Sequence, residues 1–409
     1  MNKDIRVMQI IKTTEGASWA LHQVKFLVRC GIDVHVILNN NTGKFYNKWK
    51  ESGATIYTLE SILNPLHPFK TLKSILSLRR LIKEVNPDII HSHFFINTIH
   101  MRMASFRLKP TRIFQVPGPL HLEHAIFKYI DLFSARKNDR WIASSKHIKS
   151  LYIKSGINEE RVDLSYYGND YSQFNSSDSD HLKRDHHLRN KYGFKDSDIV
   201  IGNVCYIYPP KKFLGQKVGL KNHEVMIKAI EIARQQEPRI KGLFIGGQWG
   251  DSTSYEQLLR RSIPVDEREN IVITGKIPPS EAAKGWQNLD YAIHLPLSES
   301  CGGVIEPLLA QRPVISCKTG GIPEIIIEGY TGFITSRDNP QEVASKILEV
   351  IKNKKNAIEY TLNGKNLVLD MFNIERTAKE ILEIYKKIMS IQNSYEEYSS
   401  KKYLKRVNP

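Results

Sequence analysis

The segment SESCGGVIEP, residues 298–307, combines two acidic side chains with a pair of glycines. Glu299 and Glu306 carry carboxylates, which can accept hydrogen bonds from two neighbouring hydroxyls of a sugar. Gly302 and Gly303 leave backbone N–H groups accessible, and such groups at the start of a helix bind anions. These residue types suit a ligand that contains both a sugar and a phosphate. They equally suit an ordinary helix whose first turn is capped by glutamate.

The stretches on either side of this segment predict how it is positioned. The apolar run DYAIHLP, which ends at Pro296, is typical of a buried strand, and GGVIEPLLAQ has a helical pattern starting near Gly303. Glu299 is therefore expected just beyond the carboxyl end of a strand, and Glu306 in the first turn of a helix. Ligands of parallel α/β sheets bind at that edge.

Strand and helix patterns alternate along both halves of the chain. IRVMQII, DVHVIL and DIIHSHF resemble buried strands in the first half, and DIVIGNV and IKGLFIGG resemble them in the second, with helical segments between them. Such alternation produces parallel βαβ units. The expected fold class is α/β, with two doubly wound, Rossmann-like domains facing a cleft.

The stretch from Glu299 to Ile334 resembles a known family. Its motifs AQRPVIS, GGIPEII and EGYTGFI are similar to those of the family 4 retaining nucleotide-sugar glycosyltransferases, which have the two-domain GT-B fold. The combination is specific, although each piece alone is not. The resemblance extends over most of the chain through EGASWALHQVKFLVRCGIDVHVI, NPDIIHSHF, WIASSKHIKSLY, YYGNDYSQF, GLKNHEVMIKAI and MFNIERTAKEILEIYKKI.

The resemblance implies a division of labour between domains. Residues 1–175 would form an acceptor-side domain, and residues 193–377 a domain that binds the nucleotide-sugar donor. Residues 176–192, which are polar and rich in charged residues and histidine, are expected to be a linker. A C-terminal helix over about 378–409 is expected to pack back on the first domain.

The resemblance also implies roles for single residues. Glu306 would hold the ribose of the nucleotide and Glu299 the transferred sugar. Lys221, assisted by Lys211 or Lys212, would neutralise the leaving diphosphate, where charge develops as the glycosidic bond breaks. The remaining candidates would line the donor: Gly16 near its phosphates, the amides of Gly302, Gly303 and Val304 at the sugar and diphosphate, and Lys276 and Ile277 at the base.

Bland alternatives stay open for several of these residues. Lys221, Lys211 and Lys212 could each be solvated surface lysines, and Gly16 could serve only a turn. The two glutamates also stand one residue closer together than the family usually has them, with Ser298 at the usual first position. We expect Glu299 to take that role in a shifted register, because the glycines that follow tolerate unusual backbone angles.

The histidines suggest further roles. His91 and His93 lie on one face of a strand end, where an HxH pair could bind a metal, but no matching set of ligands is evident, and packing is the favoured interpretation. His121 is the histidine nearest to the position where the family usually has one at the sugar, so it is a candidate to contact donor or acceptor. His124 could simply cap a helix. The resemblance implies no cofactor and no required metal.

Composition and charge limit the classes of partner and the cellular location that we expect. The chain has 409 residues and a formal net charge of +16, which suits anionic partners such as phosphorylated substrates or lipids. Nucleic acid is disfavoured because no zinc-finger or RNP-like motif is present. Four scattered cysteines, no signal peptide and no long apolar run indicate a cytoplasmic protein. The basic, amphipathic segment HPFKTLKSILSLRRLIKEV could rest on an anionic membrane, or be an ordinary outer helix.

These observations predict a retaining glycosyltransferase of the bacterial surface-polysaccharide type, as in capsule or lipopolysaccharide assembly. It would move a hexose-type sugar from a UDP- or GDP-sugar to a glycan or lipid-linked glycan. The location would be cytoplasmic, with peripheral contact at the inner face of the membrane as an option. Two alternatives remain: a nucleotide-sugar epimerase of the same fold, and a non-catalytic basic protein that binds membrane or nucleic acid.

Overall fold

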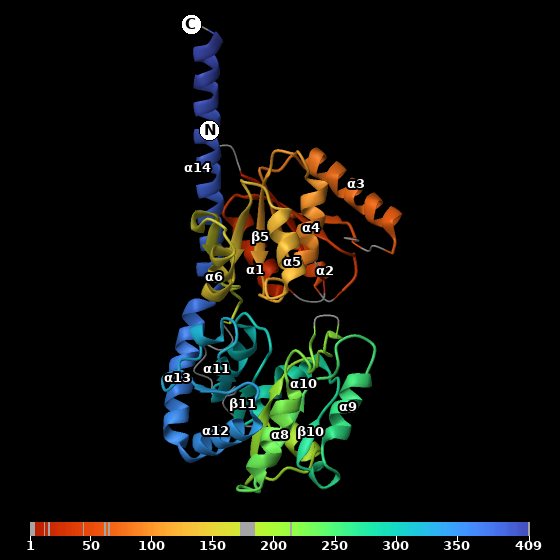
Figure 1. The fold of residues 1–409 in the computed structure, drawn as a ribbon, viewed down its shortest axis with the longest axis vertical. Coiled ribbons are helices and arrows are strands. Elements are labelled where there is room, and N and C mark those ends of the chain that lie inside the picture. Colours follow the sequence, from red (N-terminus) through yellow and green to blue (C-terminus); the bar gives the residue numbers. More distant parts are fainter. Residues whose placement is uncertain are drawn as a thin grey trace. The chain divides into compact units, whose positions relative to one another are not determined.

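A computed structural model describes residues 5–407 apart from residues 12, 15–16, 44, 61–62, 64–65, 172–184 and 213–214. The chain divides into two compact units, the first from Met1–Asp170 and Phe372–Pro409 and the second from Tyr171–Met371. Each unit has a parallel sheet with helices on its faces (Figure 1). The predicted α/β class with two doubly wound domains is therefore confirmed.

The first unit contains a sheet whose described strands are all parallel, in the order β3-β2-β1-β4-β5-β6-β7. Successive strands run outward from β1 in one direction and then from β4 in the other, so the chain reverses between β1 and β4. The strands are β1 (Arg6–Ile10), β2 (Asp33–Leu38), β3 (Thr55–Thr58), β4 (Ile89–His93), β5 (Thr111–Val116), β6 (Arg140–Ala143) and β7 (Val162–Leu164).

Helices cover both faces of this sheet because its strands carry apolar residues on both sides. On one face, α1 (Ser18–Arg29), α2 (Tyr46–Lys50) and α14 (Ile374–Val407) pack on side chains such as Val7 and Ile113. The opposite face carries α3 (Pro68–Val85), α4 (Phe95–Ala104), α5 (Ala125–Phe133) and α6 (Lys146–Lys154). Ser145 caps α6 by accepting the Ile148 N–H.

The second unit has a sheet of described strands in the order β10-β9-β8-β11-β12-β13. The chain runs outward from β8 to β10 and then returns to β11, so its direction of winding reverses between β8 and β11. The strands are β8 (Ile199–Val204), β9 (Ile240–Ile245), β10 (Ile271–Ile273), β11 (Tyr291–His294), β12 (Val314–Cys317) and β13 (Phe333–Thr335).

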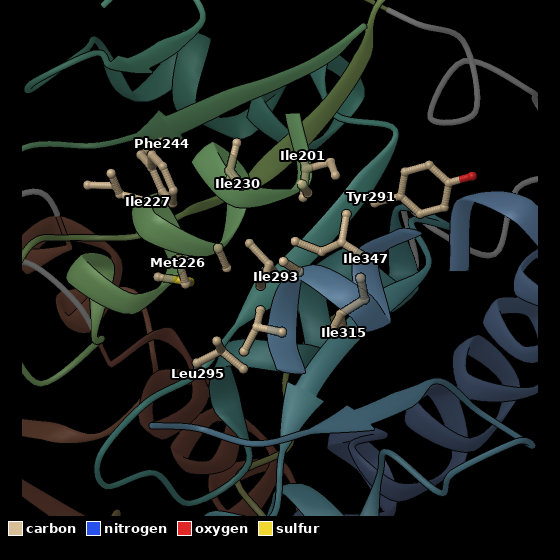
Figure 2. Close-up of a cluster of buried hydrophobic side chains, with 14 of the residues drawn as sticks. Ile201, Met226, Ile227, Ile230, Phe244, Tyr291, Ile293, Leu295, Ile315 and Ile347 are labelled. Carbon is tan, nitrogen blue, oxygen red and sulfur yellow. The ribbon is translucent and has the colours of Figure 1, made fainter. Parts of the chain in front are cut away.

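The core of the second unit forms where α8 and α12 pack on alternate residues of these strands. Figure 2 shows Ile201, Ile293 and Ile315 of the sheet together with Met226 of α8 and Ile347 of α12. The helices are α7 (His187–Lys191), α8 (His223–Arg234), α9 (Ser254–Ser262), α10 (Pro279–Ala283), α11 (Ile305–Leu309), α12 (Pro340–Lys352) and α13 (Lys354–Met371).

The predicted linker, residues 176–192, is only partly within the described residues, because 172–184 lie outside them. Its remainder forms α7, in which Leu188 and Arg189 are fully buried. The Arg189 guanidinium donates to Asp290 Oδ2 at 2.7 Å. Residues 187–191 are thus a helix of the second unit, and the prediction of a linker is wrong for them. A charged residue such as Arg189 suggests exposed surface in a sequence, because the sequence does not show that it is buried and paired with Asp290.

Candidate functional site

Two predicted residues meet at the reversal of the second sheet. Lys221 lies at the end of the loop that follows β8, and Glu299 lies in the loop that follows β11. Because β8 and β11 are neighbouring parallel strands, both loops leave from the same edge of the sheet. The crevice beyond that edge, at the point where the winding reverses, is where open α/β sheets bind ligands.

Three side chains form the centre of this site. The Lys221 ammonium donates to Glu299 Oε2 at 2.5 Å, and His294 Nε2 lies 3.3 Å from the same oxygen. The second carboxylate oxygen, Oε1, accepts the backbone N–H of Ser300 at 3.2 Å. A carboxylate only accepts hydrogen bonds, so His294 carries a proton on Nε2 in this contact. Glu299 is therefore held from both sides.

The charges of these residues depend on one another. Burial opposes the charge of Glu299, but the Lys221 ammonium and the His294 ring outweigh it and hold the pKa of the carboxyl well below its usual range. Burial likewise opposes the charge of Lys221, yet Glu299 raises its pKa above the ordinary value. Burial lowers the pKa of His294 despite the nearby carboxylate, so this ring is neutral at pH 7. The site contains an ammonium–carboxylate pair supported by a neutral imidazole.

Hydrogen bonds between loops hold this group in place. The Leu297 N–H donates to Leu220 O at 2.9 Å, which joins the loop after β11 to the loop after β8. Arg337 donates to Leu297 O at 3.1 Å, and its own carbonyl accepts from Asn222 Nδ2 at 2.9 Å. Asn222 adopts a left-handed backbone (φ 57°) directly before α8. Lys221 is thus positioned by a turn that is bonded to the opposing loop.

Two glycines are required by close approach. A Cβ on Gly303 would lie 1.9 Å from Nε2 of His294, and a Cβ on Gly320 would lie 1.8 Å from the carbonyl oxygen of Glu299. Gly320 also has a φ of +57°, which favours glycine. A Cβ on Gly302, in contrast, would have Glu299 Oε1 at 3.9 Å as its nearest neighbour. Gly320, in the pair Gly320–Gly321 after β12, therefore lets that segment pack directly against the backbone at Glu299.

The helix predicted to start near Gly303 is shorter than expected. Gly302–Val304 form a 3₁₀ turn, and the α-helix covers only Ile305–Leu309. The two glycines disfavour an α-helix. The 3₁₀ turn that forms instead brings the backbone at Gly303 close against the His294 ring. Glu306 lies in the first turn of α11, as predicted, and its carboxylate is exposed. Trp286 Nε1 donates to Glu306 Oε2 at 3.2 Å and so orients it.

The other donor-side candidates are not part of this ion pair in the described part of the chain. Lys211 and Lys212 are exposed in the loop after β8, and neither ammonium forms an ion pair within the described part of the chain. Lys276 and Ile277 follow β10, two strands away from β8, and the Lys276 ammonium donates to Gly250 O at 2.5 Å. Gly16 lies outside the described residues. The geometry brings Lys221 and Glu299 together, whereas Lys276 and Ile277 follow a strand two positions away from β8.

His121 is part of a buried network in the first unit. Its Nε2 lies 3.1 Å from the Tyr152 hydroxyl and 3.3 Å from Asp131 Oδ2, and it is only 8% exposed. Arg102 pairs with the same Asp131 at 2.7 Å. Because this nitrogen already contacts Tyr152 and Asp131, the structure favours a structural role for His121 over contact with donor or acceptor. His124 directly precedes α5 without a side-chain capping bond.

His91 and His93 are fully buried, as the packing interpretation expects. His91 Nδ1 lies 2.6 Å from the Tyr385 hydroxyl on α14, and the two imidazole rings stack with centroids 4.4 Å apart. Burial lowers the pKa of His91 to about 3, so the ring is neutral. Among the described residues, no group of three or more His, Cys, Asp or Glu side chains is arranged to hold a metal ion.

Some residues of the site were not predicted from the sequence. These are His294, which orients Glu299, and Trp286, which orients Glu306. The third is Arg337, which holds the loop backbone at Leu297. One signal was present for His294: it is the polar residue at the end of the apolar run DYAIHLP, directly before the loop. No local pattern indicates Trp286 or Arg337, because their contacts are with residues 20 and 40 positions away.

Comparisons with known proteins agree with this architecture. The family model described as "Glycosyltransferase Family 4" matches residues 16–173, and the one described as "Glycosyl transferases group 1" matches residues 212–367. A similar sequence is the capsular polysaccharide biosynthesis glycosyltransferase CapM of Staphylococcus aureus, 24% identical over 94% of this chain and 97% of its own length. An uncharacterized glycosyltransferase of Methanocaldococcus jannaschii is 23% identical over 75% of this chain and 77% of its own length.

Solved structures share the fold. HepE from Anabaena, determined with UDP and glucose, matches with a TM-score of 0.75 at 18% identity, covering 93% of this chain and 99% of its own. The lipopolysaccharide outer core galactosyltransferase WaaB matches with a TM-score of 0.65 at 15% identity, over 94% of this chain and 100% of its own. At these identities the likeness concerns the fold alone.

Proposed function

Because the chain belongs to the glycosyltransferases of group 1, with a family 4 first half, we propose that it moves a hexose-type sugar from a UDP- or GDP-sugar to a glycan or lipid-linked glycan. The observation that carries the proposal is the Lys221–Glu299 ion pair, which lies beyond the ends of β8 and β11, where the winding of the second sheet reverses. We propose further that the transfer retains the anomeric configuration. The first unit would hold the acceptor.

The pair supplies two functions that such a transfer needs. When the bond between the anomeric carbon and the diphosphate oxygen breaks, negative charge develops on the leaving diphosphate. An ammonium held at that position stabilises the charge more in the transition state than in the ground state. Lys221 is positioned by Asn222 and Leu220 to present that ammonium. Glu299, kept ionised, would accept hydroxyls of the transferred sugar and so orient it.

Glu306 is proposed to bind the ribose. Its carboxylate is exposed and oriented by Trp286, and one oxygen is left for two vicinal hydroxyls. The amides of Gly302, Gly303 and Val304 would face the sugar and diphosphate; a Cβ on Gly302 would come no closer than 3.9 Å to its nearest neighbour, Glu299 Oε1. Lys276 and Ile277 would line the base, and Gly16, Lys211 and Lys212 remain candidates for the phosphates. No metal is required in this proposal.

Known relatives support the proposed donor and setting. HepE was solved with UDP and with UDP-glucose, which favours a UDP-sugar over a GDP-sugar for this chain. The name of CapM places that relative in capsular polysaccharide biosynthesis, and we propose a bacterial surface polysaccharide, capsule or lipopolysaccharide, as the product here. The proposed location is the cytoplasm, with peripheral contact at the inner face of the membrane. None of the described helices combines the length and apolar character that a membrane span needs.

A nucleotide-diphosphate screen tests the proposal. A ligand that binds only the folded protein raises its melting temperature. We expect UDP to raise it more than GDP or ADP, and Glu306→Ala to weaken UDP binding by roughly tenfold or more, because a charged hydrogen-bond acceptor is lost. Titration calorimetry measures that affinity. Glu269→Ala, which removes an exposed glutamate after α9, is the matched control and should bind UDP normally.

The alternatives predict different results. An epimerase would convert a nucleotide sugar without any acceptor, so product formation that does not depend on added glycan would favour it. A non-catalytic basic protein would show no stabilisation by any nucleotide diphosphate, together with salt-sensitive binding to DNA or membrane. Equal UDP affinity of Glu306→Ala and the parent chain would refute the ribose assignment.

A further inference from the structure

Most of the large apolar side chains that the first unit exposes lie on one side. Twelve such side chains are exposed in the described part of this unit, and eleven of them fall between residues 66 and 133, on α3, α4, α5 and their connections. The twelfth, Ile391, is on α14. Large apolar side chains that gather on one face indicate an interaction surface, whereas scattered ones need no explanation.

Helix α5 shows the feature most clearly. Ile126, Tyr129, Ile130 and Phe133 are 63%, 64%, 36% and 77% exposed. They stand at positions i, i+3, i+4 and i+7, so they form one continuous stripe along the helix. A surface helix of a soluble protein normally turns such a stripe toward the core. Here the apolar stripe faces solvent.

The opposite side of α5 explains why the stripe cannot turn inward. Asp131 is fully buried and pairs with Arg102 of α4 at 2.7 Å. Its other oxygen accepts the Tyr152 hydroxyl at 2.6 Å and lies 3.3 Å from His121 Nε2. Rotating α5 would leave the charges of this network buried without partners, which is strongly destabilising. The network therefore fixes α5 with its apolar stripe outward.

Helix α3, on the other side of α4, carries a second exposed stripe. Phe69, Leu72 and Leu76 are 87%, 54% and 53% exposed and follow the same i, i+3, i+7 spacing. Arg79 of α3 donates to the carbonyls of Ala104 and Phe106 at the end of α4. Since Arg102 joins α4 to α5, the three helices lie side by side on one face of the sheet (Figure 1). We call their outward side the α3–α5 face.

The charge on this face has one dominant sign. Residues 66–137 contain twelve Lys or Arg and four Asp or Glu. Seven of the basic residues and two of the acidic ones are exposed. The exposed cations of α3 accompany its apolar stripe: Lys70 and Lys73 adjoin Phe69 and Leu72, and Arg80 and Lys83 lie about one and two turns beyond Leu76. Apolar side chains interleaved with cations match a surface that presents hydrocarbon below anionic groups.

We propose that the α3–α5 face binds an anionic lipid bilayer, with the α3 and α5 stripes inserted among the headgroups and the α3 cations at the phosphates. A second copy of the chain is a poorer occupant, because two such faces would bring like charges together. This face would make the peripheral membrane contact proposed for the chain. The inference rests on that part of the proposed function and not on the transfer reaction, since lipid binding needs no sugar donor.

Vesicle flotation without nucleotide sugar tests the surface directly. We expect the chain to float with vesicles of phosphatidylcholine and phosphatidylglycerol (7:3), and to bind pure phosphatidylcholine roughly tenfold less, because each cation near an anionic surface adds to binding. Ile126→Ser with Phe133→Ser should lower binding to the anionic vesicles roughly tenfold. Lys73→Gln with Arg80→Gln should lower binding to the anionic vesicles and leave the weak binding to phosphatidylcholine unchanged.

The matched control is Leu258→Ser with Val265→Ser, which removes two exposed apolar side chains, 60% and 76% exposed, from the second unit. This variant should float as the parent chain does. All variants change exposed side chains, so their melting temperatures and UDP affinities should match the parent, which separates this proposal from the transferase proposal. Absence of flotation, or full flotation of the Ile126→Ser/Phe133→Ser variant, would overturn the inference. So would a dimer, seen by light scattering, that this variant dissociates.

Discussion

At the scale of single residues, the site depends on a charge pair that neither partner could maintain alone. Glu299 is largely buried, and a buried carboxylate without a cation would take up a proton. Lys221 and His294 together keep it ionised, while Glu299 keeps Lys221 charged. Both side chains therefore stay charged in the free protein, at the place where a diphosphate and a sugar would bind. When the donor binds, each partner is expected to exchange part of this contact for the ligand.

Replacing Lys221 tests this arrangement. Lys221→Ala should lower turnover by roughly 10²- to 10³-fold, because the leaving diphosphate loses a preorganised cation. Steady-state kinetics with a UDP-sugar measure the loss. Lys228→Ala is the matched control, since Lys228 is the next lysine along the chain, is exposed on α8 and pairs with its helix neighbour Glu231. Turnover of Lys221→Ala within a factor of two of the control would refute the assignment.

At the scale of elements, the shape of the loop after β11 depends on glycines that let its backbone come close to neighbouring atoms. Its backbone turns around the His294 ring at Gly303 and is supported from beneath by Gly320. The turn places Glu299 and Glu306 on either side of the two glycines without a long helix between them. The glycines are therefore needed for space as well as for their accessible amides.

The two neighbouring glycines of this loop form a matched pair of tests. Gly303→Ala should lower the unfolding free energy by about 1–3 kcal/mol, because the new Cβ overlaps the His294 ring and something must shift. Turnover should fall as well, since a displaced ring no longer holds Glu299. Gly302→Ala meets its nearest neighbour at 3.9 Å and should change stability by no more than about 0.5 kcal/mol. Denaturant unfolding gives both values, and equal effects would contradict the packing argument.

At the scale of the whole molecule, both units bury neutral histidines. In the first unit, burial lowers the pKa of His91 to about 3 and that of His100 to about 4; in the second, burial lowers that of His223 to about 3. The unfolded chain would titrate these groups near the ordinary value of about 6.5. Between these values the unfolded state binds more protons than the folded state, so folding weakens as the pH falls.

This linkage predicts acid sensitivity. Below about pH 6.5, each such histidine should lower the unfolding free energy by up to about 1.4 kcal/mol per pH unit. Scanning calorimetry at pH 7, 6 and 5 should therefore show falling melting temperatures. His100→Asn removes one titrating group while keeping a polar partner for Ser74, so it should give a shallower pH dependence of the first unit. Melting temperatures that stay constant from pH 7 to pH 5 would contradict the prediction.

The sequence was sufficient to predict much of the fold. Apolar runs separated by helical patterns determine a parallel α/β chain, because both the strand period and the buried faces are local properties. The motifs from Glu299 to Ile334 were sufficient to indicate the family, and the structure brings Glu299 next to Lys221, 78 residues away. The linker was partly misjudged at α7, since pairing between Arg189 and Asp290 joins residues 101 positions apart.

By itself, the sequence determined which residues carry charge at the strand ends, where glycines allow close approach and which family the chain resembles. Only the tertiary structure decided that His294 holds Glu299, that Trp286 orients Glu306, and that His121 belongs to a buried network. It also decided that the apolar stripe of α5 faces solvent. The periodicity of a helix specifies that a stripe exists, but the direction it faces depends on the buried partners of Asp131, which come from three other parts of the chain.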